Sequence, residues 1–245
     1  SYNIKSAYYY QDEDDSFLKD FMKDTFDAEI YFDDNPSDLD DIDSLISNLS
    51  KYGFLVMEHP SFDTGKFENK YKDPLNNFSS RGGFSMLSGQ LVAGQDKEMI
   101  GVTFRKKTGQ SSSQRTAIVN NTDQYLSLTV GQSMVFDQYY YIENDTSAAI
   151  PARNLIAIAT FNQTDDKAIA KWKYGNGTVY FFSDFDVSFF SGDFVKAVED
   201  LAKSFVEGTC DAINITGISK NKLVKTERYL KYNSQVVKMV VYVWQ

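Results

Sequence analysis

The chain has 245 residues, of which 42% are hydrophobic, so it is long enough for one large α/β domain or for such a domain with a small appendage. Its net charge of −9 and isoelectric point near 4.7 exclude nucleic acid as a favoured partner, because an acidic surface repels a phosphate backbone. No run approaches the roughly 20 apolar residues of a membrane span and no signal peptide is recognisable, so we expect no membrane span in this chain.

The first hundred residues alternate strand and helix patterns. Apolar or β-rich runs predict strands, and the segments between them place apolar residues at helical spacing. The predicted strands are Ile4–Tyr10, Ala28–Phe32, Phe54–Met57 and Gly82–Gly89, and the predicted helices are Phe17–Phe26 and Asp38–Ser50. Apolar strands that alternate with helices favour parallel pairing in a sheet covered on both faces.

The rest of the chain carries more β structure. Short β runs joined by polar turns predict an antiparallel insertion at about 99–143, after which Leu155–Ala159 indicates a return to the buried sheet. The Gly175-Asn176-Gly177 segment between two β runs predicts a hairpin, and Asp193–Val206 predicts a helix.

Together these patterns predict an α/β fold. The sheet is expected to be mainly parallel, with helices on both faces and with four adjacent central strands: Ile4–Tyr10, Phe54–Met57, Phe84–Leu87 and Leu155–Ala159. The main domain would span 1–209 and include the antiparallel insertion, and a small C-terminal β appendage would span 210–245.

Seven Asn-x-Ser/Thr sequons are present, where chance would give about two or three in a chain of this composition. They begin at Asn48, Asn77, Asn120, Asn144, Asn162, Asn176 and Asn214. The excess favours N-linked glycans, with Asn176 as the strongest candidate, although Asn before Gly or Asp also favours turns that carry no glycan. The single cysteine, Cys210, excludes an intramolecular disulfide, and a glycosylated chain without cystine favours an extracellular archaeal envelope.

Three segments resemble, in their order and spacing, the class I glutamine-amidotransferase-like superfamily. They are Asp38–Asp43 leading into Phe54–Met57, the Gly82–Leu87 strand, and Tyr174–Asp184 followed by Phe189-Phe190 and a helix. The resemblance spans about 4–208 and is to the non-catalytic branch, which includes the luminal domain of a non-catalytic oligosaccharyltransferase component, an intraflagellar transport protein and gliding-motility proteins. It implies an amidotransferase-like or flavodoxin-like sheet.

The same resemblance implies a catalytic position that this sequence fills differently. An active member needs a cysteine nucleophile on the sharp turn after the central strand and a downstream histidine as base. Here Ser88 and Gly89 occupy that turn, and the only histidine, His59, lies upstream. Cys210 lies beyond the last predicted helix. We therefore expect no catalytic residue and no cofactor.

A rebuilt site at the carboxyl edge of the sheet is the alternative, because ligands of open α/β sheets bind there. Its candidate ligand-binding residues are Asp12, Glu58, His59, Ser88 and Asp184. A hydrolase built from Ser88 and His59 would also need an orienting carboxylate and oxyanion donors. His59 beside Pro60 is more simply explained as a surface loop residue.

Two further patterns have both a functional and a plain explanation. The acidic clusters at Asp12–Asp15 and Asp33-Asp34 suggest a calcium site, whose ligands would be Asp12, Asp14, Glu58 and Asp184. Neither cluster has the spacing of an EF-hand loop. Helix capping is therefore favoured, and no metal is predicted. The runs Tyr8–Tyr10 and Tyr139–Tyr141 are typical of sugar-stacking surfaces. Consecutive strand residues alternate in direction, so at least one tyrosine of each run is expected in the core.

These observations favour a non-catalytic, extracellular structural or assembly protein of the cell surface. Both alternating sets of residues in Val236–Trp244 are apolar, which indicates burial on two faces. We expect the chain to self-associate through Ser1–Tyr10 or Leu223–Gln245, or to bind other envelope proteins. The alternative is a carbohydrate-binding or hydrolytic protein with a rebuilt site.

Overall fold

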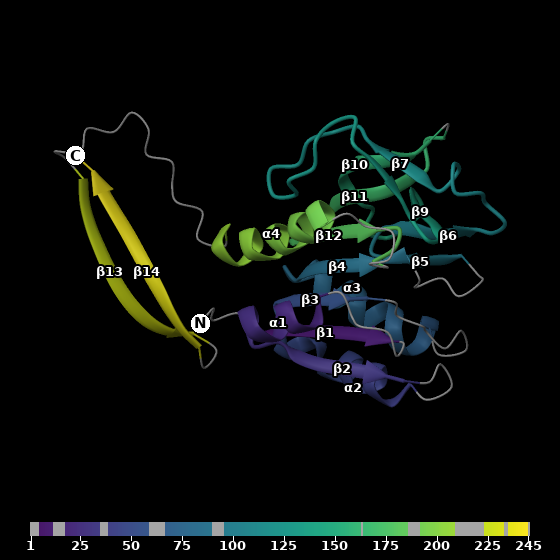
Figure 1. Cartoon of the computed structure of the whole chain (residues 1–245). Coiled ribbons are helices and arrows are strands. Elements are labelled where there is room, and N and C mark those ends of the chain that lie inside the picture. Colours follow the sequence, from purple (N-terminus) through teal and green to yellow (C-terminus); the bar gives the residue numbers. More distant parts are fainter. Residues whose placement is uncertain are drawn as a thin grey trace. The chain divides into compact units, whose positions relative to one another are not determined.

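The protein is described from a computed structural model of the whole chain (Figure 1). The structure describes residues 5–11, 18–34, 39–58, 67–89, 96–162, 164–185, 192–208, 223–232 and 235–244. For 67–69, 192–195, 205–208 and the last two strands it describes the backbone alone. The chain forms two compact units, Ser1–Phe205 and Val206–Gln245, and each is described by itself.

One half of the large sheet is parallel. In the order β2-β1-β3-β4-β12, every neighbouring pair is parallel. These strands are β1 (Ser6–Gln11), β2 (Glu29–Asp33), β3 (Phe54–Met57), β4 (Phe84–Ser88) and β12 (Gly177–Phe182). Their connections contain α1 (Lys19–Phe26), α2 (Asp40–Asn48), a 3-10 turn (Leu49–Lys51), a π-helical turn (Phe67–Lys72) and α3 (Asp73–Ser80). The predicted β-strand and helix pattern of the first hundred residues is therefore confirmed, with ends that shift by a few residues.

The other half of the sheet is antiparallel. From β12 it continues through β11 (Lys167–Tyr174), β10 (Arg153–Phe161), β7 (Thr116–Val119) and β8 (Ser133–Val135). Three more strands, β5 (Lys97–Met99), β6 (Val102–Lys107) and β9 (Tyr139–Asn144), pair with one another and reach β11 through β9. The predicted hairpin is confirmed: Gly175 and Asn176 form the turn between β11 and β12.

The expectation of a mainly parallel sheet is wrong for this half of the molecule. Leu155–Ala159 lies within β10, which is separated from β4 by β12 and β11 and runs antiparallel to β11. The physical reason is the tight turn at Gly175, because a two-residue connection can join only antiparallel neighbours. The apolar run was also a weak indicator of full burial, since Ile156 remains 39% exposed.

Burial in the parallel half follows the alternation of the strands. Tyr9 and Leu55 belong to a core cluster that includes residues of α2 and α3, such as Phe78. At the alternate positions, the ring of Phe54 contacts the edge of Phe26 in α1, with centroids 5.7 Å apart. Neighbouring residues of one strand therefore pack into different parts of the core.

Both tyrosine runs are largely buried. Tyr8 and Tyr9 are fully buried in β1, and Tyr139, Tyr140 and Tyr141 in β9 are at most 9% exposed. The expectation that each run contributes to the core is confirmed, and Tyr10 is the half-buried member of the two runs. Trp172 is also buried, and its indole N–H donates to the carbonyl oxygen of Ile100 at 2.9 Å.

The last described helix and strands come after the antiparallel half in the sequence. Helix α4 spans Gly192–Gly208 and crosses the boundary between the two units. In the second unit, β13 (Leu223–Tyr232) and β14 (Gln235–Trp244) form an antiparallel two-stranded sheet, with Leu223 opposite Trp244. Within the described part of the chain, no helix is long and apolar enough to cross a membrane.

Candidate functional site

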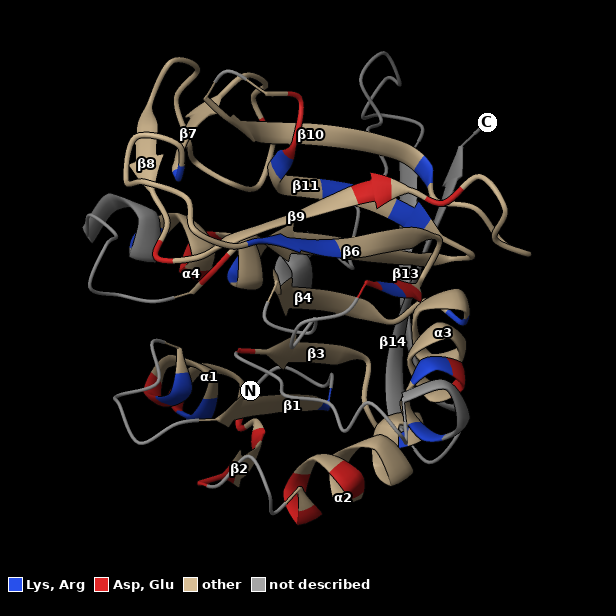
Figure 2. Cartoon of the chain, turned by 90° about the vertical axis from the view of Figure 1, so that its right-hand side faces the viewer, with Lys and Arg blue, Asp and Glu red and all other residues tan. Residues whose placement is uncertain are grey.

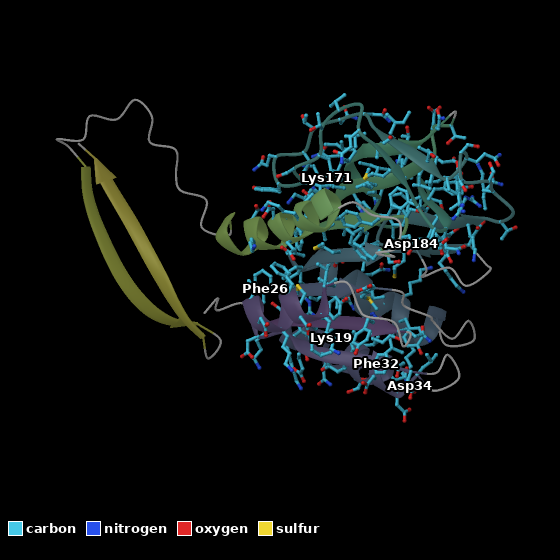
Figure 3. All side chains as sticks on the ribbon, viewed as in Figure 1. Lys19, Phe26, Phe32, Asp34, Lys171 and Asp184 are labelled. Carbon is cyan, nitrogen blue, oxygen red and sulfur yellow. The ribbon has the colours of Figure 1, made fainter. Side chains whose placement is uncertain are left out.

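Three of the predicted site residues end adjacent parallel strands. Glu58 directly follows β3, Ser88 is the last residue of β4, and Asp184 lies two residues beyond β12. The register pairs Ser88 with Phe182, so these strand ends meet at the carboxyl edge of the sheet, where Figure 3 labels Asp184. Asp12 and His59, the other two candidates, lie outside the described residues, as does Asp14.

This group lies inside the protein. Ser88 and Asp184 have no exposed surface, and Glu58 is 4% exposed. The hydroxyl of Tyr8 donates to a carboxylate oxygen of Glu58, and one carboxylate oxygen of Asp184 accepts the N–H of Phe185 at 2.8 Å. The hydrogen bonds that Glu58 and Asp184 accept suit a structural role as well as a chemical one.

The insertion covers the turn where the resemblance places a nucleophile. A Cβ atom on Gly89 would lie 2.1 Å from Cβ of Tyr140 and 2.6 Å from the carbonyl oxygen of Ser183, so β9 and the end of β12 press directly on this turn. The hydroxyl of Ser183 accepts the N–H of Tyr140 at 3.0 Å and donates to the carbonyl oxygen of Gln138 at 3.1 Å. Burial of the backbone here is therefore matched by hydrogen bonds.

Tyr140 is buried, yet charged side chains lie close to it. Burial raises the pKa of its hydroxyl, and the nearby Asp184 raises the pKa further, whereas Lys106 opposes both. The Lys106 ammonium lies 5.0 Å from the centroid of the Tyr140 ring, within cation–π range. Sequence reasoning did not assign Tyr140 to this edge, because its contact with Gly89 joins segments far apart in the chain.

The Asp33-Asp34 cluster is explained by helix capping. The carboxylate of Asp33 accepts the N–H of Asp41 at 2.9 Å, the N–H of Ile42 at 3.0 Å and the hydroxyl of Tyr9 at 3.0 Å. It thus caps the acidic start of α2, which Figure 2 shows in red. Burial raises the pKa of Asp33 above its ordinary value, against the lowering effect of these donors. Among the residues that the structure describes, no three acidic, His or Cys side chains could hold a metal ion.

A second buried carboxylate, Asp123, was not identified from the sequence. Its side chain has no exposed surface and forms an ion pair with Lys171, which Figure 3 labels. It also accepts the hydroxyl of Tyr180 at 3.0 Å and the N–H groups of Tyr125 and Leu126 at 2.9 and 3.0 Å. Burial alone would raise the pKa of Asp123, but Lys171 and the two N–H groups outweigh it and hold the pKa below its ordinary value. The arrangement ties the loop after β7 to β11 and β12.

Three hollows lined by described residues lie away from the carboxyl edge. One of about 550 Å³ lies between α4 and the loop before β8, and one of about 380 Å³ lies on β7 and β10. A third, of about 290 Å³, lies where the chain enters β3 and β4, at the opposite edge of the sheet from Ser88.

The sequon asparagines differ in exposure. Asn77, Asn120, Asn144, Asn162 and Asn176 are exposed, and Asn48 is half-buried at the end of α2. Asn214 lies outside the described residues. Exposure permits modification but does not establish it, so glycosylation stays a prediction.

Comparisons with known proteins identify a shared fold. No family model matches the chain, and no curated protein does. A GMP synthase component from Thermoplasma acidophilum has a similar structure, with 12% identity, a TM-score of 0.53 and coverage of 85% of this chain and 99% of that one. β-Galactosidases from Bacillus circulans and Rahnella sp. R3 match at 12% and 10% identity with TM-scores of 0.50, covering 93% and 92% of this chain. This chain spans 34% of each of those two chains.

These similarities define the class of fold and nothing finer. The protein is a mixed α/β protein with a large, strand-rich sheet, and its likeness to a glutamine-amidotransferase-type protein is compatible with the resemblance seen in the sequence. At such low identity, the likeness does not carry over any activity.

Proposed function

We propose that this protein is a non-catalytic, extracellular structural or assembly protein of the cell surface, on a fold of the non-catalytic amidotransferase-like branch. The observation that carries the proposal is the closed carboxyl edge: Ser88 is fully buried, and Gly89 has no room for a side chain beneath Tyr140. A nucleophile must be reached by substrate, so a buried serine under a covering strand supports loss of the family's chemistry.

The proposal includes a parallel half covered by helices on both faces. Its support is the division of the core, in which Tyr9 packs with α2 and α3 whereas Phe54 contacts Phe26 of α1. Such cover is expected for parallel strands that are apolar at consecutive positions.

The extracellular setting is supported by the sequons. Five of the six described sequon asparagines are exposed. The single cysteine excludes an intramolecular disulfide, which among extracellular settings favours an archaeal envelope. We propose N-linked glycans at several of these sites and an archaeal envelope as the setting. Peptide masses from the native protein that showed bare asparagine at all seven sites would contradict this part of the proposal.

Self-association through the second unit is supported by its strand pattern. The two strands pair only with each other among the described residues, and a two-stranded sheet is marginal alone. The register places Val224 opposite Val243 and Leu230 opposite Val237, so one face of the hairpin is predominantly apolar in sequence. We propose that a neighbouring copy of the chain covers it or extends it by strand addition.

Analytical ultracentrifugation tests the assembly proposal. Deleting Leu223–Gln245 should leave a folded monomer, and so should the full-length double variant Val237→Lys/Val241→Lys. The matched control, Lys225→Glu with Lys231→Glu, changes the polar positions of β13 and should still assemble. A deleted or Val-to-Lys protein that assembles as the unmodified chain does would place the contacts elsewhere.

One observation favours the alternative, a carbohydrate-binding or hydrolytic protein with a rebuilt site. Glu58, Ser88 and Asp184 end adjacent strands at the edge where α/β proteins bind ligands. A serine-reactive probe tests the hydrolytic form of this alternative. Stoichiometric labelling of Ser88, lost in Ser88→Ala and on unfolding, would support hydrolysis, whereas the proposed scaffold should stay unlabelled, because a serine hydroxyl without a positioned base is a weak nucleophile.

A further inference from the structure

The sequons differ in the exposure of their hydroxyl residue as well as in the exposure of their asparagine. A sequon is recognised through two side chains, the asparagine amide that is modified and the hydroxyl two residues later, and its usual setting is therefore a surface loop. An exposed asparagine whose hydroxyl partner is buried cannot present both groups without local opening. This distinction separates the sequons of this chain.

The Asn144 sequon presents both groups. Asn144 is the last residue of β9, and both it and Thr146 are exposed. Among the described residues, neither of their side chains makes a hydrogen bond, whereas the intervening Asp145 accepts the N–H and hydroxyl of Ser147 at 2.9 and 2.7 Å. The turn is thus fixed by Asp145 while the acceptor amide and the threonine hydroxyl face solvent.

The Asn77 sequon presents only the asparagine. All three of its residues lie in α3, where Phe78 is 3% exposed and Ser79 is 1% exposed. The β11–β12 hairpin lies directly over this turn of helix, because a Cβ atom on Gly177 would be 2.1 Å from the carbonyl oxygen of Ser79. Access to the serine hydroxyl would require α3 and the hairpin to separate.

Asn176, the strongest candidate from sequence, falls between these cases. The asparagine is exposed at the hairpin tip, but Thr178 is half-buried in β12. The hydroxyl of Thr178 also accepts a hydrogen bond from the ammonium of Lys173 at 2.5 Å. The paired strands must fray before this sequon can be read.

We infer that Asn144 accepts an N-linked oligosaccharide on the folded protein, whereas Asn77 accepts one only before folding. In the transfer, Nδ2 of the asparagine forms a bond to C1 of the sugar and loses a proton. The bond from C1 to a polyprenyl diphosphate donor breaks, and the lipid diphosphate leaves with the electron pair. The inference rests on the proposed glycoprotein character, but it concerns the acceptor competence of each sequon.

An in vitro transfer assay tests the inference on the full chain. Protein from a host without N-glycosylation is incubated, folded, with a purified oligosaccharyltransferase and a lipid-linked oligosaccharide, and a parallel sample is first digested to peptides that contain each whole sequon. Mass spectrometry gives occupancy at Asn144 and Asn77 in both samples. Dividing the folded by the peptide value removes the intrinsic preference for threonine over serine sequons.

We expect this normalised occupancy to be at least about tenfold higher at Asn144 than at Asn77. Thr146→Ala should remove transfer at Asn144 without affecting Asn77 peptides. Equal normalised values, or a folded Asn144 that stays bare although its peptide is modified, would overturn the inference. Bare sequons in the native host would instead count against the proposed glycoprotein, and they would leave the measured ratio unchanged.

Discussion

The buried carboxylate of Asp123 provides the sharpest test of how the antiparallel half is held together. Asp123→Ala removes the acceptor for Lys171, for the Tyr180 hydroxyl and for two backbone N–H groups. Breaking a fully buried ion pair costs about 3–5 kcal/mol. Lys171 is 24% exposed and regains some hydration, so we expect a loss of about 3 kcal/mol in the free energy of unfolding.

The expected loss corresponds to a measurable fall in melting temperature. For a domain of roughly 200 residues, each 1 kcal/mol shifts Tm by about 2–4 °C, so Asp123→Ala should lower Tm by about 6–12 °C. Thermal unfolding followed by circular dichroism gives the value. Asp165→Ala is the matched control, because Asp165 is exposed, and it should change stability by less than about 0.5 kcal/mol.

Two further variants separate charge from hydrogen bonding. Asp123→Asn keeps an acceptor oxygen and should cost less than Asp123→Ala. The double variant Asp123→Asn/Lys171→Met removes both charges and should recover part of the loss, because a buried pair replaced by neutral groups leaves no unpaired charge. A Tm for Asp123→Ala that matches the Asp165→Ala control would refute the structural role of this carboxylate.

Three other perturbations follow from the same contacts. The pKa of Asp123 is lowered in the folded state. The stabilisation from this carboxylate is therefore present above the ordinary pKa of about 3.9 and is lost as pH falls through the folded-state pKa. The urea midpoints at pH 7 and pH 3 should differ less in Asp123→Asn than in the unmodified chain. Gly89→Ala should destabilise by about 1–3 kcal/mol through overpacking against Tyr140, and an unchanged midpoint in the same urea titration would argue against this close contact. Asp33→Ala should cost about 1–2 kcal/mol because it removes the cap of α2, and a similar urea midpoint for the exposed neighbour Asp34→Ala would argue against capping.

The sequence predicted what depends on local pattern. Apolar residues at helical spacing identified α2, and the consecutive apolar residues of Phe54–Met57 identified a strand buried on both faces. The Gly175-Asn176-Gly177 turn identified a hairpin from three residues, because its geometry is set by the turn itself. Each of these features is determined within about a dozen residues of chain.

What could not be predicted depends on partners far apart in sequence. Asp123 differs from other loop aspartates only through Lys171 and Tyr180, which lie 48 and 57 positions away. Strand direction has the same difficulty, since the apolar run at Leu155–Ala159 fits a parallel or an antiparallel strand equally well. Its direction follows from the order β12-β11-β10, which two short connections impose.

The sequence alone could answer only in part whether this carboxyl edge is catalytic. The absence of a cysteine after β4 can be read directly, but it leaves a serine that could in principle act. In the proposed non-catalytic function, the burial of Ser88 involves two further residues: Gly89, which makes room for Tyr140, and Ser183, whose hydroxyl accepts the N–H of Tyr140. A cysteine in place of Ser88 would therefore still be covered by β9. Moving β9 away from this position would break the hydrogen bond between the Ser183 hydroxyl and the Tyr140 N–H. Under the proposed non-catalytic function, the packing of Gly89 against Tyr140 is an internal contact, and we expect the protein to bind its partners through its outer faces.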